Sequence, residues 1–171
     1  MKKDYEVIKR FLENPSDEEE IFESETLIFV DWREYDEDII TYFNQKIDNK
    51  IEVKLIDNGK DHGEDIVLRR DSKELRIPYE NNIMERDVTI KYLNEFINPE
   101  YQIRWFLETL GNDTLGFVLL SFEEWNLLEK EFTNKVQDYF LEINLDSSMF
   151  NLSFEEVGKL LEIRKKKIEN L

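Results

Sequence analysis

The 171-residue sequence has no cysteine and little of several other residue types that carry chemistry. The absence of cysteine excludes disulfides, thiolate metal sites and cysteine nucleophiles. There is one histidine and there are five glycines, and neither a glycine-rich phosphate loop nor an H-E-x-x-H metal motif occurs. No apolar run approaches the roughly 20 residues of a membrane helix. The first residues include two lysines without a following apolar stretch, so they do not resemble a signal peptide. We therefore expect a cytoplasmic protein with no cofactor, no metal and no membrane contact.

Positive charge is also scarce. Forty Asp and Glu oppose 23 Lys and Arg, a net charge of −17, yet 13% of the residues are aromatic, which is typical of a folded chain. Residues 1–49 and 108–157 each carry a net −9, residues 50–107 carry −2 and residues 158–171 carry +3. Such acidity argues against nucleic acid or an anionic membrane as a direct partner and favours a basic protein. Charge can equally serve solubility alone, and the basic run Arg164–Lys167 can serve the dipole of a C-terminal helix.

The hydrophobic pattern predicts an α+β fold. Apolar residues recur at helical spacing in 4–13, 36–48, 86–98 and 134–143, and helices are also expected after Ser121 and over 153–170. Strands are expected at 26–30, 50–56, 65–70, 74–79, 101–107 and 114–120. The strands come in neighbouring hairpins, with turns at 71–73 and 111–113. We therefore predict a mainly antiparallel sheet built from hairpins, with helices packed on one face and a C-terminal helix.

Three Ser-Phe-Glu-Glu or Ser-Asp-Glu-Glu sequences predict capping boxes at helix starts, beginning at Ser16, Ser121 and Ser153. The stretch 144–151 is typical of a linker. We expect a single α+β domain over 1–146, followed by a linker and a C-terminal helix over 147–171, packed on the domain or on a partner.

The segment from 31 to 38 is the best candidate for a partner-binding site. It combines two aromatic residues with five acids: Asp31, Trp32, Glu34, Tyr35, Asp36, Glu37 and Asp38. Exposed aromatic side chains supply contact area, and carboxylates pair with Arg or Lys of a partner. The alternative is that the aromatic residues close the core and the acids cap a helix.

His62 is the other candidate for chemistry, since Asp61, Glu64 and Asp65 lie nearby in the sequence. A histidine among carboxylates can act as a base or bind a divalent metal. The spacing matches no motif with a known mechanism, and a polar loop between two strands explains the same residues.

One unit resembles a known group of proteins. The residues Ile103-Arg-Trp-Phe, Asp113-Thr-Leu-Gly-Phe and Ser121-Phe-Glu-Glu-Trp125 form a predicted strand-strand-helix unit. Together with the small, acidic, cysteine-free character of the chain, this unit resembles the immunity proteins of bacterial polymorphic toxin systems. The resemblance implies a stoichiometric inhibitor that covers the active site of a cationic toxin, often a nuclease.

We therefore predict a non-enzymatic acidic module that binds a basic protein, most specifically an immunity-type inhibitor. Two alternatives stay open at this point. One is a regulator that mimics DNA, which requires carboxylates spaced like duplex phosphates. The other is an enzyme of unknown reaction that uses His62 and nearby carboxylates.

Overall fold

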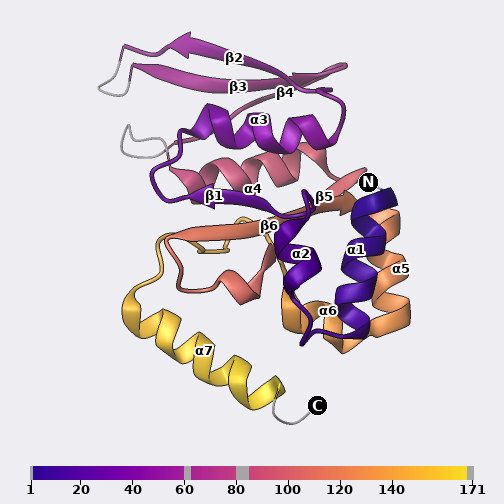
Figure 1. The fold of residues 1–171 in the computed structure, drawn as a ribbon. Coiled ribbons are helices and arrows are strands. Elements are labelled where there is room, and N and C mark those ends of the chain that lie inside the picture. Colours follow the sequence, from indigo (N-terminus) through magenta and orange to yellow (C-terminus); the bar gives the residue numbers. More distant parts are fainter. Residues whose placement is uncertain (1, 60–62, 80–84, 169–171) are drawn as a thin grey trace.

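Two antiparallel sheets organise the molecule (Figure 1). The computed structural model describes residues 2–59, 63–79 and 85–168. The larger sheet has the order β1-β6-β5-β7, formed by β1 (Ile28–Asp31), β6 (Thr114–Ser121), β5 (Tyr101–Phe106) and β7 (Phe140–Glu142). The smaller sheet has the order β2-β3-β4, formed by β2 (Glu52–Asp57), β3 (Glu64–Arg70) and β4 (Lys73–Arg76). All pairs are antiparallel, and the predicted α+β class is confirmed.

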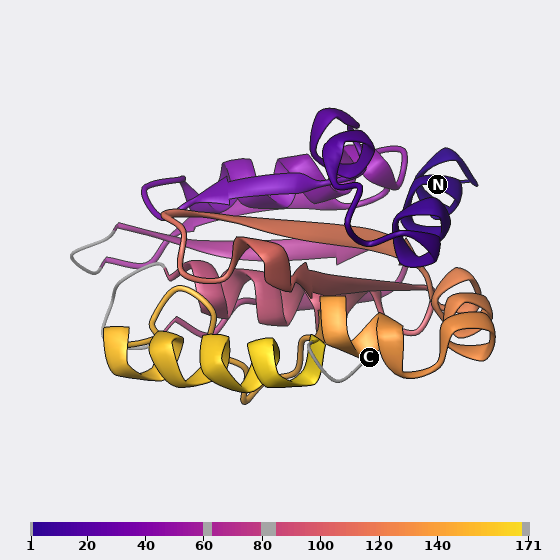
Figure 2. The same cartoon turned by 60° about the horizontal axis from the view of Figure 1, so that its bottom comes forward.

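Helices lie on both faces of the larger sheet rather than on one (Figure 1 and Figure 2). Helices α3 (Asp36–Lys46) and α4 (Arg86–Ile97) lie between the two sheets. The opposite face is covered by α1 (Lys2–Glu13), α2 (Glu19–Glu23), α5 (Phe122–Phe132) and α6 (Asn134–Tyr139). The cause lies in β6, where six consecutive residues from Leu115 to Leu120 are buried, so this central strand has two faces to cover. In β5 the polar Arg104 and the apolar Phe106 are buried on one face, and Ile103 and Trp105 on the other.

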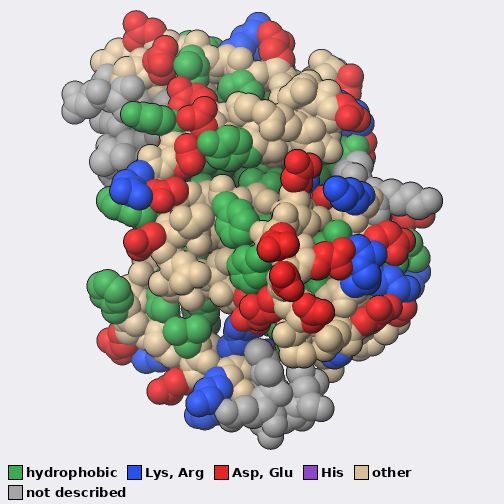
Figure 3. All heavy atoms as spheres, in the orientation of Figure 1, with side chains coloured by type: hydrophobic (Ala, Val, Ile, Leu, Met, Phe, Trp, Pro, Cys, Tyr) green, Lys and Arg blue, Asp and Glu red, His purple; other side chains and the backbone are tan. Residues whose placement is uncertain are grey.

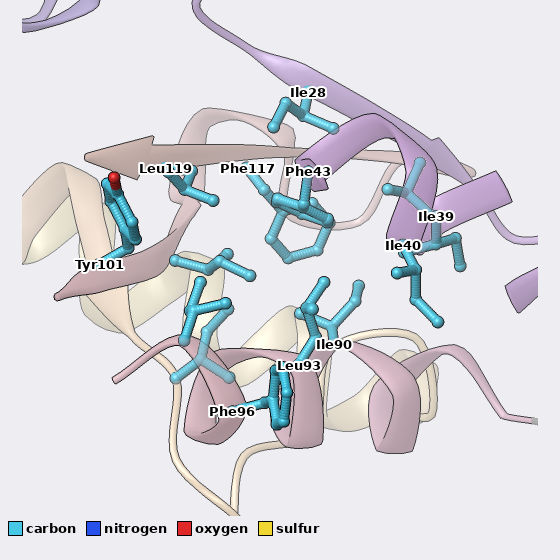
Figure 4. Close-up of a cluster of buried hydrophobic side chains, with 14 of the residues drawn as sticks. Ile28, Ile39, Ile40, Phe43, Ile90, Leu93, Phe96, Tyr101, Phe117 and Leu119 are labelled. Carbon is cyan, nitrogen blue, oxygen red and sulfur yellow. The ribbon is translucent and has the colours of Figure 1, made fainter. Parts of the chain in front are cut away.

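Each face of the larger sheet has its own core. Phe117 and Leu119 point toward α3 and α4, where Phe43 and Leu93 meet them (Figure 4). Ile103 of β5 belongs to the same cluster. On the other face lie Phe106, Val118, Leu120 and Phe140, with Trp125 of α5. Burial of apolar side chains on both faces fixes the register, because a shift by one residue would exchange the two cores.

Two of the three predicted capping boxes are present. Ser121 accepts a hydrogen bond from the backbone N–H of Glu124, whose carboxylate accepts one from the backbone N–H of Ser121. Ser153 and Glu156 make the same pair of bonds at the start of α7 (Phe154–Ile168). The box predicted at Ser16 is wrong. The Ser16 hydroxyl donates to Asn14 instead, and α2 begins at Glu19 without a side-chain cap.

The helix predicted over 134–143 is too long. It ends at Tyr139, and residues 140–142 form β7 at the edge of the larger sheet. Phe140 pairs with Phe106 of β5 and is fully buried, so tertiary packing selects the strand over the helical spacing.

The C-terminal segment packs on the rest of the protein. Met149 is 4% exposed. Arg164 of α7 forms an ion pair with Glu108, and Lys167 Nζ lies 3.7 Å from Asp138 Oδ1. Within the described part of the chain, no helix combines the length and the apolarity needed to cross a membrane.

Candidate partner-binding face

The 31–38 segment connects β1 to α3 and presents both of its aromatic side chains to solvent. Trp32 is 53% exposed and Tyr35 is 73% exposed, so neither closes the core. The backbone explains their position. The N–H of Trp32 still donates to the carbonyl of Asp113 at 3.1 Å, and the N–H of Glu34 then donates to the carbonyl of Asp31 at 2.9 Å. This turn ends the strand and directs the chain away from the sheet.

Asp31 is held in place by Arg33. Its carboxylate accepts the backbone N–H of Arg33 at 2.8 Å and the Nε–H of the same residue at 3.0 Å. These hydrogen bonds, the side-chain bond first, lower the pKa of Asp31 to about 2. The carboxylate is therefore ionised at neutral pH and is paired within the segment.

The other acids of the segment divide into surface and core. Asp38 is exposed, and Glu34 and Glu37 are half-buried. Asp36 requires a correction, because it is 4% exposed and accepts a hydrogen bond from the Thr89 hydroxyl of α4. Burial raises the pKa of the Asp36 carboxyl. Asp36 joins α3 to α4 and is not available to a partner.

A groove opens beside Trp32, with a volume of about 400 Å³. We call it the Trp32 groove. Its walls come from segments far apart in the sequence, namely Trp32, the 111–113 turn, Leu115, Met149, Phe150, Leu152, Ser153, Phe154 and Val157. Phe154, the first residue of α7, is 98% exposed. In Figure 3, hydrophobic side chains stand on the left side of the molecule, where Figure 1 shows the start of α7.

The sequence did not indicate the 149–157 part of this groove. Phe154 occupies the position after the serine of a capping box, and Phe122 of α5 has the same local sequence and is 45% exposed. An aromatic residue at the first position of a helix is a weak signal of exposure. The assembly of the groove depends on contacts that no local pattern encodes.

Asp87 of α4 fixes the wall of the groove. Its carboxylate accepts the backbone N–H groups of Met149 at 3.0 Å and of Phe150 at 2.9 Å. Asp87 is 2% exposed. Phe150 also packs against Phe117 of β6, with ring centroids 6.3 Å apart. One buried and one part-buried hydrogen bond and one ring contact therefore hold this segment on the core.

The charge around the Trp32 groove is negative. Among its lining residues, all of which the structure describes, there is no Lys or Arg, and Asp113 is acidic. The nearest cation in sequence is Arg33, which pairs with Asp31 and lies 5.6 Å from the centre of the Trp32 ring. The groove thus combines aromatic and aliphatic walls with one acidic lining residue, Asp113.

The two acidic stretches of the sequence are residues 1–49 and 108–157. Part of each lies on the same face of the larger sheet, where α1 and α2 come from the first stretch and α5 and α6 from the second. Lys9 of α1 pairs with Glu131 of α5 at 2.8 Å, and Lys135 of α6 donates to the carbonyl of Leu12 at 3.0 Å. Figure 3 shows Asp and Glu side chains gathered over α1 and α2, with a few Lys and Arg among them. The acids of 31–38 lie apart from this group, at the end of β1 (Figure 1).

His62 lies outside the described residues. In 2–59, 63–79 and 85–168, no group of three or more His, Asp and Glu side chains is arranged to hold a metal ion.

Comparison with known proteins gives no relative: no family model, no curated protein and no solved structure matches this chain.

Proposed function

We propose that this protein is a non-enzymatic, cytoplasmic module that binds a basic protein through the Trp32 groove and the neighbouring acids of the 31–38 segment. The observation that carries the proposal is the exposure of Trp32, 53%, at the wall of a groove of about 400 Å³. Half-exposed tryptophan beside a concave surface is the kind of residue that dominates binding energy in protein interfaces. Tyr35, three residues further along the same segment, is 73% exposed.

Charge supports a basic partner. The chain carries a net −17, and most of the described cations near the acidic segments pair within the molecule, as Arg33 does with Asp31 and Arg10 with Glu20. A positively charged protein would be attracted over long distances and a negatively charged one repelled.

The most specific form of this proposal is an immunity-type inhibitor. In that case the partner is a cationic toxin, and the accessible carboxylates of Glu34, Glu37 and Asp38 take the positions of substrate phosphates in its active site. The support is the resemblance in sequence character together with an acidic surface that has aromatic anchors.

Photo-cross-linking in the native cell tests the proposal. A photoreactive phenylalanine analogue replaces Tyr35 in one variant and Leu127 of α5, which is 46% exposed, in a control variant. We expect a basic protein to be cross-linked from position 35 only, and the yield to fall in a Trp32→Ala background. An acidic adduct, or equal yields from both positions, contradicts the proposal.

The inhibitor form has its own test. The cross-linked protein is expressed alone and together with the wild-type chain. We expect growth to stop in the first case and to be restored in the second, with restoration lost for Trp32→Ala. If the captured protein is harmless when expressed alone, the module binds a basic protein but is not an immunity protein.

A further inference from the structure

The outer edge of β1 has free backbone groups. Among the strands of the described residues, β1 pairs with β6 alone, and the register places Ile28 opposite Phe117 and Val30 opposite Leu115. The hydrogen bond from the Trp32 N–H to Asp113 shows which residues face β6, because alternate residues of an antiparallel strand point their backbone groups to the same side. The backbone N–H and C=O groups of Ile28, Val30 and Trp32 therefore point toward β6. Those of Phe29 and Asp31 point to the outer side of β1, away from the sheet.

The outward groups at Phe29 are unused. Among the residues that the structure describes, nothing bonds to the backbone N–H or C=O of Phe29. At Asp31 the carbonyl accepts the Glu34 N–H, which leaves the N–H of Asp31 directed outward. Figure 1 shows β1 at the near edge of the larger sheet, with no strand beside it on that side. The edge thus offers donor, acceptor and donor in the spacing of a strand.

An aromatic pair flanks this edge. Phe29 is 39% exposed and stacks on Phe22 of α2, which is 37% exposed, with ring centroids 6.3 Å apart. Folded proteins usually protect an edge strand with lysine, proline, a bulge or a covering loop. Ile28–Asp31 contains neither lysine nor proline, and its one charged residue is Asp31. An open edge beside exposed phenylalanines is a liability to aggregation unless a partner uses it.

The charge around β1 selects the partner. Glu23 and Glu25 precede the strand, and Glu37 and Asp38 follow it, all of them exposed or half-buried. A second copy of this chain would bring the same acids to the edge and be repelled. An extended segment rich in Lys or Arg would be attracted.

We propose that an extended basic segment of the partner adds to β1 as a fifth strand of the larger sheet. The main-chain hydrogen bonds would form at Phe29 and Asp31, one side chain of the added strand would cover the Phe22–Phe29 pair, and its basic side chains would meet the flanking acids. The inference rests on the proposed function and specifies how the basic protein is held next to the Trp32 groove.

A synthetic peptide tests strand addition directly. The probe is an acetylated and amidated octapeptide of alternating Lys and Val. Its control is the same peptide with every internal amide N-methylated, which has the same charge but has no internal N–H to donate to a neighbouring strand. We expect saturable binding of the first peptide only, with amide hydrogen exchange slowed about tenfold or more at Phe29 and Asp31. Exchange in β2, the free edge of the smaller sheet, should stay unchanged.

Two variants locate the contact. Phe29→Pro removes the outward N–H and no hydrogen bond to β6, whereas Phe29→Ala removes the ring and keeps the N–H. We expect the proline variant to bind the peptide about tenfold more weakly than the alanine variant. Denaturant unfolding shows whether both variants are folded. If the proline variant is not folded, the test rests on the wild type, where the amide exchange of Phe29 and Asp31 is compared with and without the peptide.

Equal binding of the two peptides, absence of binding, or unchanged exchange at Phe29 overturns strand addition. These outcomes are distinct from failure of the proposed function. If a basic protein is cross-linked from position 35 while Phe29 stays unprotected, the module binds its partner through the Trp32 groove without adding a strand.

Discussion

Trp32 is the side chain on which the proposed contact depends most. Because it is 53% exposed, its replacement by alanine should lower the free energy of unfolding by only about 1–2 kcal/mol. The loss of an anchoring aromatic side chain should nevertheless weaken binding of the cross-linked partner by about 2 kcal/mol or more, roughly 30-fold. Isothermal titration and denaturant unfolding measure the two quantities.

Two aromatic residues serve as controls for Trp32. Phe122→Ala removes a side chain of similar exposure, 45%, from α5, and should leave binding unchanged. Trp125→Ala removes a fully buried side chain and should cost about 3–5 kcal/mol of stability. If Phe122→Ala weakens binding as much as Trp32→Ala, the contact is not centred on the Trp32 groove.

Asp31 gives a pH prediction with a defined sign. Its pKa is lowered from 3.8 to about 2 in the folded protein, first by the side-chain hydrogen bond of Arg33 and then by the backbone N–H of the same residue. A lowered pKa stabilises the fold above the unfolded value, so this contribution is complete above about pH 4 and is lost as the pH falls toward 2. Carboxyl NMR titration should give a midpoint near 2.

Arg33→Ala separates the two causes of this shift. The variant loses the guanidinium but keeps the backbone N–H, so the midpoint of Asp31 should rise only part of the way to 3.8. A midpoint that does not move on substitution would show that the Arg33 side chain has no part in holding Asp31.

At the scale of elements, one carboxylate connects α4 to the wall of the Trp32 groove. Asp87→Ala leaves the N–H groups of Met149 and Phe150 without their acceptor, and each buried donor costs about 1–3 kcal/mol. Asp87→Asn keeps one acceptor oxygen and should cost about half as much. We also expect faster amide exchange at Met149 and Phe150, and weaker partner binding, although Asp87 itself is buried.

Asp146→Ala is the matched control, because it removes an exposed acid from the same connecting segment. It should leave both stability and binding unchanged within about 0.5 kcal/mol. Equal effects of the two alanine variants would mean that charge, rather than anchoring of the segment, determines the result.

Most elements could be predicted from the sequence because their signals are local. The capping boxes at Ser121 and Ser153 start helices as expected, and the hairpin turn at 71–73 joins β3 to β4. The failures lie where distant contacts decide. Residues 140–142 have helical apolar spacing, yet they form a strand because β5 offers a free edge and the core accepts Phe140.

The candidate site shows the same division. The exposure of Trp32 and Tyr35 was one of two predicted alternatives, and the pattern of aromatic and acidic residues could not choose between them. The sequence places Asp36 among the partner-binding acids of the 31–38 segment, with capping of the following helix as the alternative. Its burial follows from the approach of Thr89 on α4, which no local sequence reveals.

At the scale of the whole molecule, the position of the cations matters as much as the excess of acids. Lys9, Arg10 and Arg164 pair with Glu131, Glu20 and Glu108, so these positive charges stabilise contacts between elements and contribute little to the outer field. The net charge of −17 therefore gives the surroundings a field that is negative overall. Such a field changes the rate at which a basic protein arrives more than the rate at which it leaves.

Salt dependence of association measures this effect. Raising the salt concentration from about 20 mM to about 500 mM should slow association with the cross-linked partner by about 10- to 100-fold, because the screening length falls to a few ångströms. The dissociation rate should change little.

Replacing the exposed acids Asp38 and Asp113 with Asn should slow association at low salt and reduce its salt dependence, whereas Glu123→Gln on α5 should have a smaller effect. Stopped-flow kinetics gives both rates. An association rate that is constant over this range would mean that the acids serve solubility alone and that the groove binds without electrostatic attraction.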